Sequence, residues 1–206
     1  MHENALTIEA AHLFPQFSKF REFYLAGGTA LALQIGHRLS VDFDFFSTET
    51  LPANVLSKVK RVFNNSSIVV TYQAPEEQLN MLIDGVKTTF FYYPYPLLDL
   101  SEKYKGVPIA SVREIASMKA FSIGKRLAYK DYVDWYFLLK EQHIDLVDVI
   151  EHAKKKFGGD FNDRLFLGQL VSLADIATQK IDFLREEVDR QTIEDFLKET
   201  VRAFKL

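Results

Sequence analysis

Hydrophobic positions along the chain follow two different periods, and the change falls near residue 110. Before it, short runs rich in β-branched and aromatic residues alternate with turns; after it, apolar residues recur at helical spacing. The first half predicts helices over 5–17, 29–35 and 52–63 and strands over 41–46, 67–72, 79–83 and 86–93. The second half predicts helices over 111–129, 131–140, 144–157, 164–177 and 192–204. Because strands and helices do not alternate regularly, we predict an α+β fold and not a doubly wound parallel sheet.

The same change predicts how the chain is divided. We expect an α+β core over residues 1–110 and a helical C-terminal part over 111–206 that packs on the core and completes the site. Asp84–Gly85, between two predicted strands, is the strongest short hairpin signal. Ser111 and Glu114 have the spacing of a capping box, which predicts that a helix starts there.

The composition is that of an ordinary globular protein. Of the 206 residues, 48% are hydrophobic and 26% are charged, and the net charge of −3 provides no global basic field for nucleic acid or an anionic membrane. There is no cysteine, which excludes disulfides, thiolate metal sites and cysteine nucleophiles. No apolar run reaches the roughly 18 residues of a membrane span, and the N-terminus lacks the features of a signal peptide. We therefore expect a soluble, cytoplasmic protein.

Two features between residues 25 and 46 indicate chemistry. Gly27–Gly28 open a predicted helix whose free N–H groups suit a phosphate, and Thr29 is placed to cap that helix. Asp42 and Asp44 alternate with hydrophobic residues on a predicted strand, so both carboxylates point to one face. Such a pair repels unless a cation lies between its members, and hard oxygen ligands select Mg²⁺ or Mn²⁺. Taken singly, the glycines are typical of a turn and the aspartates of a solvated strand; together they favour a site.

The predicted C-terminal helices carry a second set of charges. Lys119, Ser122, Arg126 and Lys130 have the spacing of one helix side, and a basic stripe facing a metal-bound acidic strand suits a triphosphate. Lys119 lies in a mostly apolar context, so we expect it to have a partner. Lys130 is equally typical of a solvated face. We interpret Lys154–Lys156 as a solvated helix end, with contact to an RNA backbone as the alternative.

Four further residues are interpreted individually. Asp131 falls in the first turn of the next predicted helix, where the helix dipole favours a carboxylate for structural reasons alone. Asp134 lies among aromatic residues and should be paired, either with a Lys or Arg of the preceding helix or with the active-site metal. Arg38 has two open roles: contact with a phosphate or base, or neutralisation of the two strand aspartates. His37 is assigned no catalytic role.

Together these residues resemble a known family. Gly27-Gly-Thr29, a short helix, Gly-His-Arg38-x-Ser and Asp42-x-Asp44-Phe-Phe look like the active-site signature of the AbiEii-type nucleotidyltransferases. These are the toxin partners of type IV toxin–antitoxin systems, within the DNA polymerase β-like superfamily. The helix around Lys119 and the motif Asp131-x-x-Asp134 are similar to later motifs of that family, and the resemblance covers about 24–139. It implies a polymerase β-like head, a mixed sheet flanked by helices, with a helical C-terminal part.

The resemblance also implies an activity: metal-dependent transfer of an NMP from an NTP to a hydroxyl acceptor, either the 3′ end of tRNA or a protein. It assigns catalysis to Asp42, Asp44, Lys119, Asp131 and Asp134. It assigns nucleotide binding to Gly27, Gly28, Thr29, Arg38, Lys119 and Arg126. The metal, Mg²⁺ or Mn²⁺, falls to Asp42 and Asp44, and a cognate antitoxin protein is the implied partner.

The sequence departs from the family pattern at one important place. Polymerase β-like enzymes usually carry a third carboxylate on a later strand, but residues 86–93 contain no acid, which leaves the role of base to Asp131 or Asp134. A catalytically silent nucleotidyltransferase-fold module that binds RNA or a protein partner is therefore the alternative, and an enzyme that modifies its own antitoxin is another. A haloacid-dehalogenase-like phosphatase also begins with Asp-x-Asp, but it requires Thr or Val where Phe46 stands.

Overall fold

A computed structural model gives the fold, and it describes residues 1–100, 103–123, 125 and 128–204. A five-stranded mixed sheet has the strand order β1-β2-β5-β4-β3. The strands are β1 (Tyr24–Ala26), β2 (Phe43–Ser47), β3 (Ile68–Ala74), β4 (Gln78–Ile83) and β5 (Val86–Tyr92). β2 and β5 run parallel, whereas all other neighbours are antiparallel. The predicted hairpin is confirmed: Asp84 and Gly85 both have positive φ and join β4 to β5.

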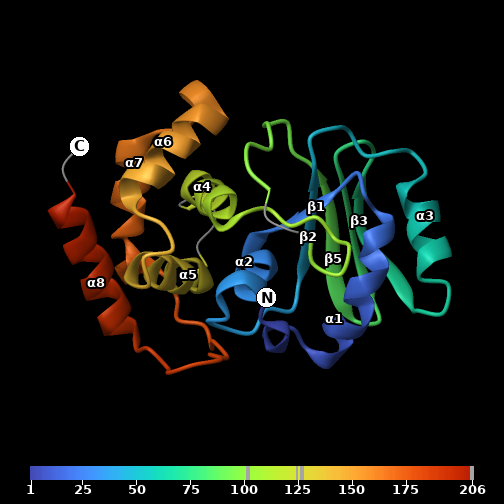
Figure 1. Ribbon diagram of the computed structural model, residues 1–206, viewed down its shortest axis with the longest axis horizontal. Coiled ribbons are helices and arrows are strands. Elements are labelled where there is room, and N and C mark those ends of the chain that lie inside the picture. Colours follow the sequence, from blue (N-terminus) through green and yellow to red (C-terminus); the bar gives the residue numbers. More distant parts are fainter. Residues whose placement is uncertain (101–102, 124, 126–127, 205–206) are drawn as a thin grey trace.

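Helices flank the sheet and form the second half of the chain (Figure 1). The first half contains α1 (Ile8–Leu13), α2 (Gly27–Ile35) and α3 (Val55–Val62). The second half contains α4 (Val112–Ser122), α5 (Tyr129–Lys140), α6 (Leu146–Phe157), α7 (Asp163–Leu170) and α8 (Arg190–Ala203). Short 3₁₀ turns cover Glu3–Ala5, Phe14–Lys19, Gly158–Asp160 and Leu173–Asp175. The α+β prediction is confirmed, and none of the helices in the described ranges has the length and apolar character to cross a membrane.

Alternation along β2 divides the aromatic residues between the two faces of the sheet. Phe43 and Phe45 point to one face and are fully buried, and Phe17 packs on both, with ring centroids 5.1 and 4.6 Å away. Phe90 of β5 stacks on Phe45 at 5.3 Å. Each such pair adds about 0.5–1.5 kcal/mol beyond its burial, so this cluster holds β2 in register. The opposite face of β2 therefore carries Asp44.

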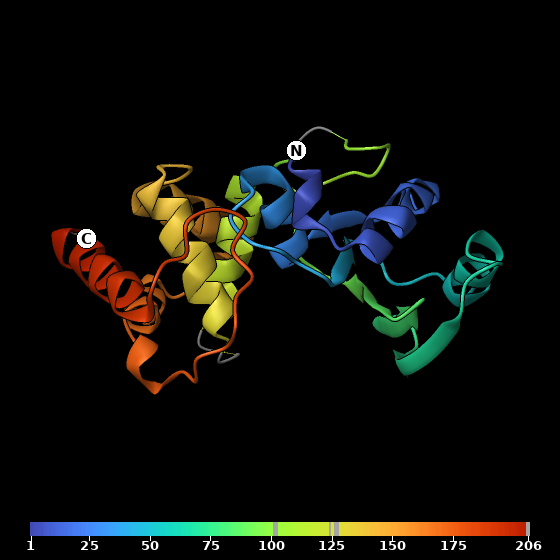
Figure 2. The same cartoon turned by 90° about the horizontal axis from the view of Figure 1, so that it is seen from below.

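Helix α2 joins the two halves of the molecule. It packs against β1 and β2 on one side and against α4 and α5 on the other. Every residue from Thr29 to Leu33 is buried, as expected of a helix that has neighbours all round. Both views show α2 between the sheet and the C-terminal helices (Figures 1 and 2). Residues at either end of α2 are thus held against both halves.

Several predicted element boundaries were wrong, and the four largest or most informative differences are these. α4 ends at Ser122 and not near residue 129, because Ile123 has an extended backbone (ψ 142°) and a glycine follows at position 124. β2 begins at Phe43, and Val41 is outside it and 47% exposed. α7 ends at Leu170, before the weak helix formers Val171 and Ser172. α1 ends at Leu13, where a 3₁₀ segment containing Pro15 takes over.

Two consequences concern charged residues. Lys130 belongs to α5 and not to the helix of Lys119, so the predicted four-residue basic stripe on one helix does not exist in that form. Lys156 is not solvated as predicted: its ammonium donates to Glu114 Oε1 and to the carbonyl oxygen of Pro96, each at 2.5 Å.

The capping box is half confirmed, because Ser111 accepts from the Glu114 N–H while the Glu114 side chain pairs with Lys156 instead.

Candidate active site

The turn between β1 and α2 lies against Asp44 and Arg38. Gly27 has φ +74°, and a Cβ there would lie 2.9 Å from Asp44 Oδ2. A Cβ on Gly28 would lie 2.7 Å from the Arg38 guanidinium. Both positions therefore need glycine for the N-terminus of α2 to approach these side chains so closely. That N-terminus brings free N–H groups next to the acidic strand.

Thr29 connects α2 to the segment that leads into β2. Its hydroxyl lies 2.8 Å from the Ser40 hydroxyl and donates to the carbonyl oxygen of Asp42. The predicted capping role is wrong, because α2 begins at Gly27 and no side chain caps it. Thr29 instead fixes the backbone that carries Asp42.

Most of the predicted residues line one small cavity, which we call the carboxylate pocket. Its lining residues are Gly28, Thr29, Arg38, Ser40, Asp42, Asp44, Lys119, Lys130 and Asp131. Lys130 Nζ lies 4.0 Å from Asp42 Oδ2. Arg126 lies outside the described residues. The pocket brings together carboxylates, cations and a helix N-terminus from elements about 100 residues apart in sequence.

Asp134 does not line this pocket; it lies behind it. Its carboxylate is fully buried and accepts from Arg38 Nε (2.7 Å), from Arg38 Nη2 (3.1 Å) and from His37 Nε2 (2.7 Å). Lys119 Nζ lies 2.6 Å from Oδ2 of the same carboxylate, the oxygen that Arg38 Nη2 also contacts. Burial alone would raise the pKa of Asp134, but Arg38, Lys119 and the His37 hydrogen bond hold that pKa well below its ordinary value. The carboxylate is thus a fixed anion that orients two cations.

Lys119 is the residue that links this buried cluster to the pocket. Its ammonium lies 2.8 Å from Asp131 Oδ1 and 2.6 Å from Asp134 Oδ2, and the side chain is 4% exposed. The expected partner for this lysine is confirmed. Asp131 lines the pocket and Asp134 does not. The partners of Asp134 are Lys119 of the preceding helix, which is one of the two expected alternatives, and Arg38.

His37 completes the buried cluster. Its ring packs at 5.3 Å from Phe137 and contacts Asp134 through Nε2. Burial lowers the pKa of His37, so near neutral pH the imidazole is uncharged and Nε2 donates its hydrogen to Asp134. Sequence reasoning left this residue without a partner.

A loop from the C-terminal half straps the segment that carries His37 and Arg38, and sequence reasoning missed it. The N–H of Leu39 donates to the Asp182 carbonyl (2.8 Å), and that of Leu184 donates to the His37 carbonyl (3.1 Å). Arg185 donates to the Gly36 and Ile35 carbonyl oxygens at the C-terminus of α2. Figure 2 shows this loop passing the end of α2. We call residues 181–185 the strap; nothing in their sequence marks the contact.

A second cavity of about 180 Å³ adjoins the first, and we call it the aromatic pocket. Its lining residues are Gly27, Asp44, Phe46, Phe91, Tyr93, Ile115, Met118, Lys119 and Ser122. Asp44 and Lys119 line both pockets. The two cavities therefore meet at one carboxylate and one ammonium.

Asp42 and Asp44 are the residues of the carboxylate pocket that could hold a divalent cation of the Mg²⁺ type. Mg²⁺ is usually held by one or two carboxylates, with substrate phosphates and water as its other ligands, and Asp42 and Asp44 supply such a pair. Within the described ranges, no three Asp, Glu or His side chains gather around a metal position. In the parallel register, Thr89 lies beside Asp44, and β5 itself carries no acidic residue.

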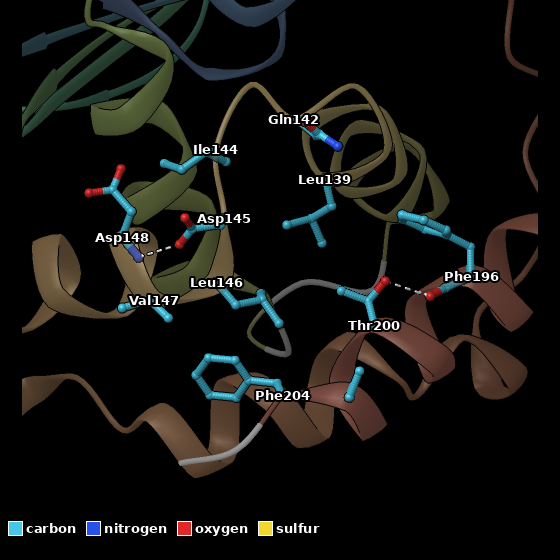
Figure 3. Close-up of a pocket in the computed structure, with 11 residues that line it drawn as sticks. Leu139, Gln142, Ile144, Asp145, Leu146, Val147, Asp148, Phe196, Thr200 and Phe204 are labelled. Carbon is cyan, nitrogen blue, oxygen red and sulfur yellow. Dashed lines mark hydrogen bonds between the residues drawn. The ribbon is translucent and has the colours of Figure 1, made fainter.

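A larger cavity of about 680 Å³ lies elsewhere, between the α5–α6 connection and the end of α8 (Figure 3). It is lined by Leu139, Leu146, Phe196 and Phe204, with Asp145 and Asp148 at one side. The Asp145 carboxylate accepts from the Asp148 N–H, as a helix cap does. None of the predicted site residues lines this cavity, so size alone does not locate the site.

Comparison with known proteins identifies a family. Residues 11–104 match the family described as "Nucleotidyl transferase AbiEii toxin, Type IV TA system". The Aquifex aeolicus (strain VF5) protein aq_aa25, described as uncharacterized, is 36% identical over 186 residues, which cover 89% of this chain and 88% of that protein.

Two crystal structures from Helicobacter pylori share the fold. One is described provisionally as a nucleotidyltransferase and superposes with a TM-score of 0.64, at 22% identity, over 98% of this chain and 92% of that one. The other, JHP933, has a TM-score of 0.53 at 18% identity, over 98% and 94% of the two chains. With this family match and this relative, and with the glycine turn and acidic strand described above, the chain belongs to the AbiEii nucleotidyltransferase family.

Proposed function

We propose that this nucleotidyltransferase moves an NMP from an NTP to a hydroxyl acceptor, with Mg²⁺ or Mn²⁺ held by Asp42 and Asp44. The observation that carries the proposal is the composition of the carboxylate pocket. Two carboxylates that suit a divalent cation lie in the same cavity as Arg38, Lys119 and the N-terminus of α2. A triphosphate needs this combination of metal ligands and cations.

The cations of the pocket bind and orient the triphosphate. The N–H groups at the start of α2 and the Arg38 and Lys119 side chains supply hydrogen-bond donors and positive charge. The bound metal would supply Lewis-acid stabilisation of the charge that develops on the phosphate oxygens. Because Asp134 holds Arg38 by two bonds and Lys119 by one contact, both cations are oriented before the substrate binds.

Activation of the acceptor falls to Asp131. The acceptor hydroxyl attacks the α-phosphorus in line, the bond to the pyrophosphate oxygen breaks, and pyrophosphate leaves with its negative charge near Lys119. Of the two aspartates on α5, Asp131 lines the pocket and Asp134 is sealed behind it. Asp131 is therefore the residue on α5 that can reach an acceptor hydroxyl and accept its proton.

Family membership supports the biological setting. We propose that the protein acts as the toxin of a type IV toxin–antitoxin pair, with a cognate antitoxin, in the cytoplasm. The acceptor is the 3′ end of tRNA or a protein hydroxyl. Mass spectrometry of the co-expressed pair separates these acceptors, since a modified antitoxin gains the mass of one NMP.

The test is transfer of label from α-labelled NTPs to a total tRNA pool in the presence of Mg²⁺. We expect label in RNA with the wild-type protein, loss of label with Asp42→Asn or Asp44→Asn, and no change with the surface control Asp195→Asn. Absence of transfer to tRNA and to co-expressed protein, or transfer that survives both site substitutions, would contradict the proposal.

A second candidate function is a catalytically silent module that binds RNA or a protein partner. One observation favours it: β5, the strand beside Asp44, carries no acid, although the family pattern expects a third carboxylate on a later strand. Calorimetry distinguishes the two functions. A silent module binds its partner but shows no metal-dependent NTP binding, whereas the enzyme binds the NTP only with Mg²⁺ or Mn²⁺ present.

A further inference from the structure

Aromatic side chains on the site face of the sheet are only partly buried. Phe43, Phe45 and Phe90 on the opposite face are buried to 1% exposure or less. Phe46 and Phe91, which share a face with Asp44, stay half-buried. Large apolar rings left partly open next to a charged site are typical of a ligand surface, since folding alone would favour covering them.

The arrangement of the rings gives the aromatic pocket flat walls. Phe46 and Phe91 stack nearly parallel, with centroids 5.2 Å apart and planes at 22°. Tyr93 meets Phe46 edge-on at 5.4 Å. Ile115 and Met118 of α4 close the other side. Such walls suit a planar ring that stacks or slides between aromatic and apolar surfaces.

The size of the pocket limits its ligand to one ring system. Its volume is about 180 Å³. An apolar cavity of about 150 Å³ is enough to bind benzene, whereas pockets for whole drug-sized molecules start at about 300 Å³. The pocket thus holds a ring-sized group, and the rest of the ligand must extend beyond it.

Charge is confined to one end of the pocket. Asp44 and Lys119 stand at its boundary with the carboxylate pocket, and the remaining lining side chains are uncharged. Under the proposed function the carboxylate pocket takes a polyanionic group, so a molecule that spans both cavities has a flat, uncharged ring at one end and the polyanion at the other. A nucleotide has this form.

We propose that the aromatic pocket binds a nucleobase, with Phe91 and Phe46 as its stacking residues. The inference rests on the proposed function, because it takes the carboxylate pocket as the site of the triphosphate. Two sources supply the same chemistry: the base of the donor NTP, or the terminal base of a nucleic-acid acceptor. In both cases the ribose lies near Asp44 and Lys119, where the two cavities meet.

The test compares Phe91→Leu, which keeps an apolar side chain but removes the ring face, with Ser122→Leu, which fills the pocket from α4. Tyr72→Leu is the matched control, since Tyr72 is 53% exposed on β3 and lines neither pocket. Thermal unfolding followed by circular dichroism verifies that each variant folds. Calorimetry then measures the Kd of a non-hydrolysable NTP analogue and of inorganic tripolyphosphate, with Mg²⁺, and steady-state kinetics gives KM for the tRNA pool.

If the donor base occupies the pocket, Phe91→Leu and Ser122→Leu raise the Kd of the NTP analogue about tenfold and leave tripolyphosphate binding unchanged. If the acceptor base occupies it, NTP binding is unchanged and KM for tRNA rises about tenfold. Either result supports the inference. An unchanged Kd of the NTP analogue and an unchanged KM for tRNA with both variants would overturn it.

These outcomes are separable from failure of the proposed function. Wild-type protein that transfers NMP normally while the pocket variants change nothing refutes the nucleobase site and leaves the activity intact. Wild-type protein that binds the NTP analogue in a Phe91-dependent way but transfers nothing refutes the activity and leaves the pocket assignment intact.

Discussion

Two aspartate pairs of similar appearance in the sequence have opposite surroundings in the structure. Asp42 directly precedes β2 and Asp44 lies on it, and the Asp42 side chain is 31% exposed. Asp131 and Asp134 lie on α5 and are 5% and 0% exposed. The first pair faces the cavity at the start of α2, while Asp134 is surrounded by three basic side chains.

The difference shows that the carboxylates of one site have two separate roles, metal binding and the orientation of cations. A carboxylate that is to hold a metal must reach the cavity, whereas a carboxylate that orients cations works best when buried and already bonded. In Asp134 the cost of burial is offset by Arg38, Lys119 and His37. Asp131 stands between the two cases, since it lines the cavity and also contacts Lys119.

The largest effect is expected from the exposed pair. Asp42→Asn or Asp44→Asn should reduce NMP transfer on the order of 10³-fold, because several kcal/mol of metal-dependent transition-state stabilisation are lost. The melting temperature should stay constant or rise slightly, since one of two like charges that line the same cavity is removed. Transfer kinetics and differential scanning calorimetry measure the two effects; a collapse of stability with either variant would place these residues in the fold and not in the chemistry.

Substitution of the buried Asp134 should instead have a large effect on stability. Asp134→Asn removes the anion that compensates Arg38 and Lys119, and loss of one partner of a buried ion pair costs about 3–5 kcal/mol of unfolding free energy. Urea unfolding measures this loss. The matched control is Asp163→Asn, which breaks the surface contact with Lys154 (2.5 Å) and should cost less than about 1 kcal/mol. Equal losses for the two variants would show that the buried cluster contributes no more to the free energy of unfolding than a surface ion pair does.

The contrast between the pairs was only partly predictable from sequence. Alternation correctly placed Asp44 opposite the buried Phe43 and Phe45, because a strand with one buried face fixes which side each residue takes. The apolar surroundings of Asp134 correctly indicated a paired charge. Its burial behind Lys119 depends on where α4 ends. Residue spacing alone predicted an end near residue 129, whereas α4 ends at Ser122.

The strap and the aromatic pocket could not be predicted, for a physical reason. Both depend on contacts between segments far apart in the chain: Asp182 with Leu39, and α4 with the end of β5. Local periodicity reports which face of an element is buried, but not what covers it. Lys156 shows the same limit, since its position in a lysine run predicts exposure while tertiary packing pairs it with Glu114.

A smaller effect is expected from the strap, which supports the buried cluster from outside. Arg185→Met removes the donors to the Gly36 and Ile35 carbonyl oxygens and frees the segment that carries Arg38. We expect KM for the NTP to rise about tenfold, the equivalent of one or two lost hydrogen bonds, with a smaller change in kcat. Arg185→Lys should restore part of the affinity. A uniform loss of active protein with unchanged KM would instead indicate a purely structural role.

The smallest effect is a pH dependence of stability. Because burial lowers the pKa of His37 below its unfolded value near 6.5, the unfolded state binds the proton more readily. The free energy of unfolding should therefore fall as pH decreases through about 6.5, by at most about 1.4 kcal/mol per pH unit for each proton. Urea unfolding at about pH 7.5 and about pH 5.5 tests this, and His37→Gln, which keeps a donor but does not titrate, should show a shallower fall. An identical slope for the two proteins would contradict the assignment.

Binding of Mn²⁺ together with a non-hydrolysable NTP, followed by electron paramagnetic resonance, tests the distinction between the two aspartate pairs most directly. The wild-type protein should take up the ion in the presence of the nucleotide, and Asp42→Asn combined with Asp44→Asn should abolish the uptake while the protein remains folded. Uptake of the ion by that double variant at the wild-type affinity would contradict the account.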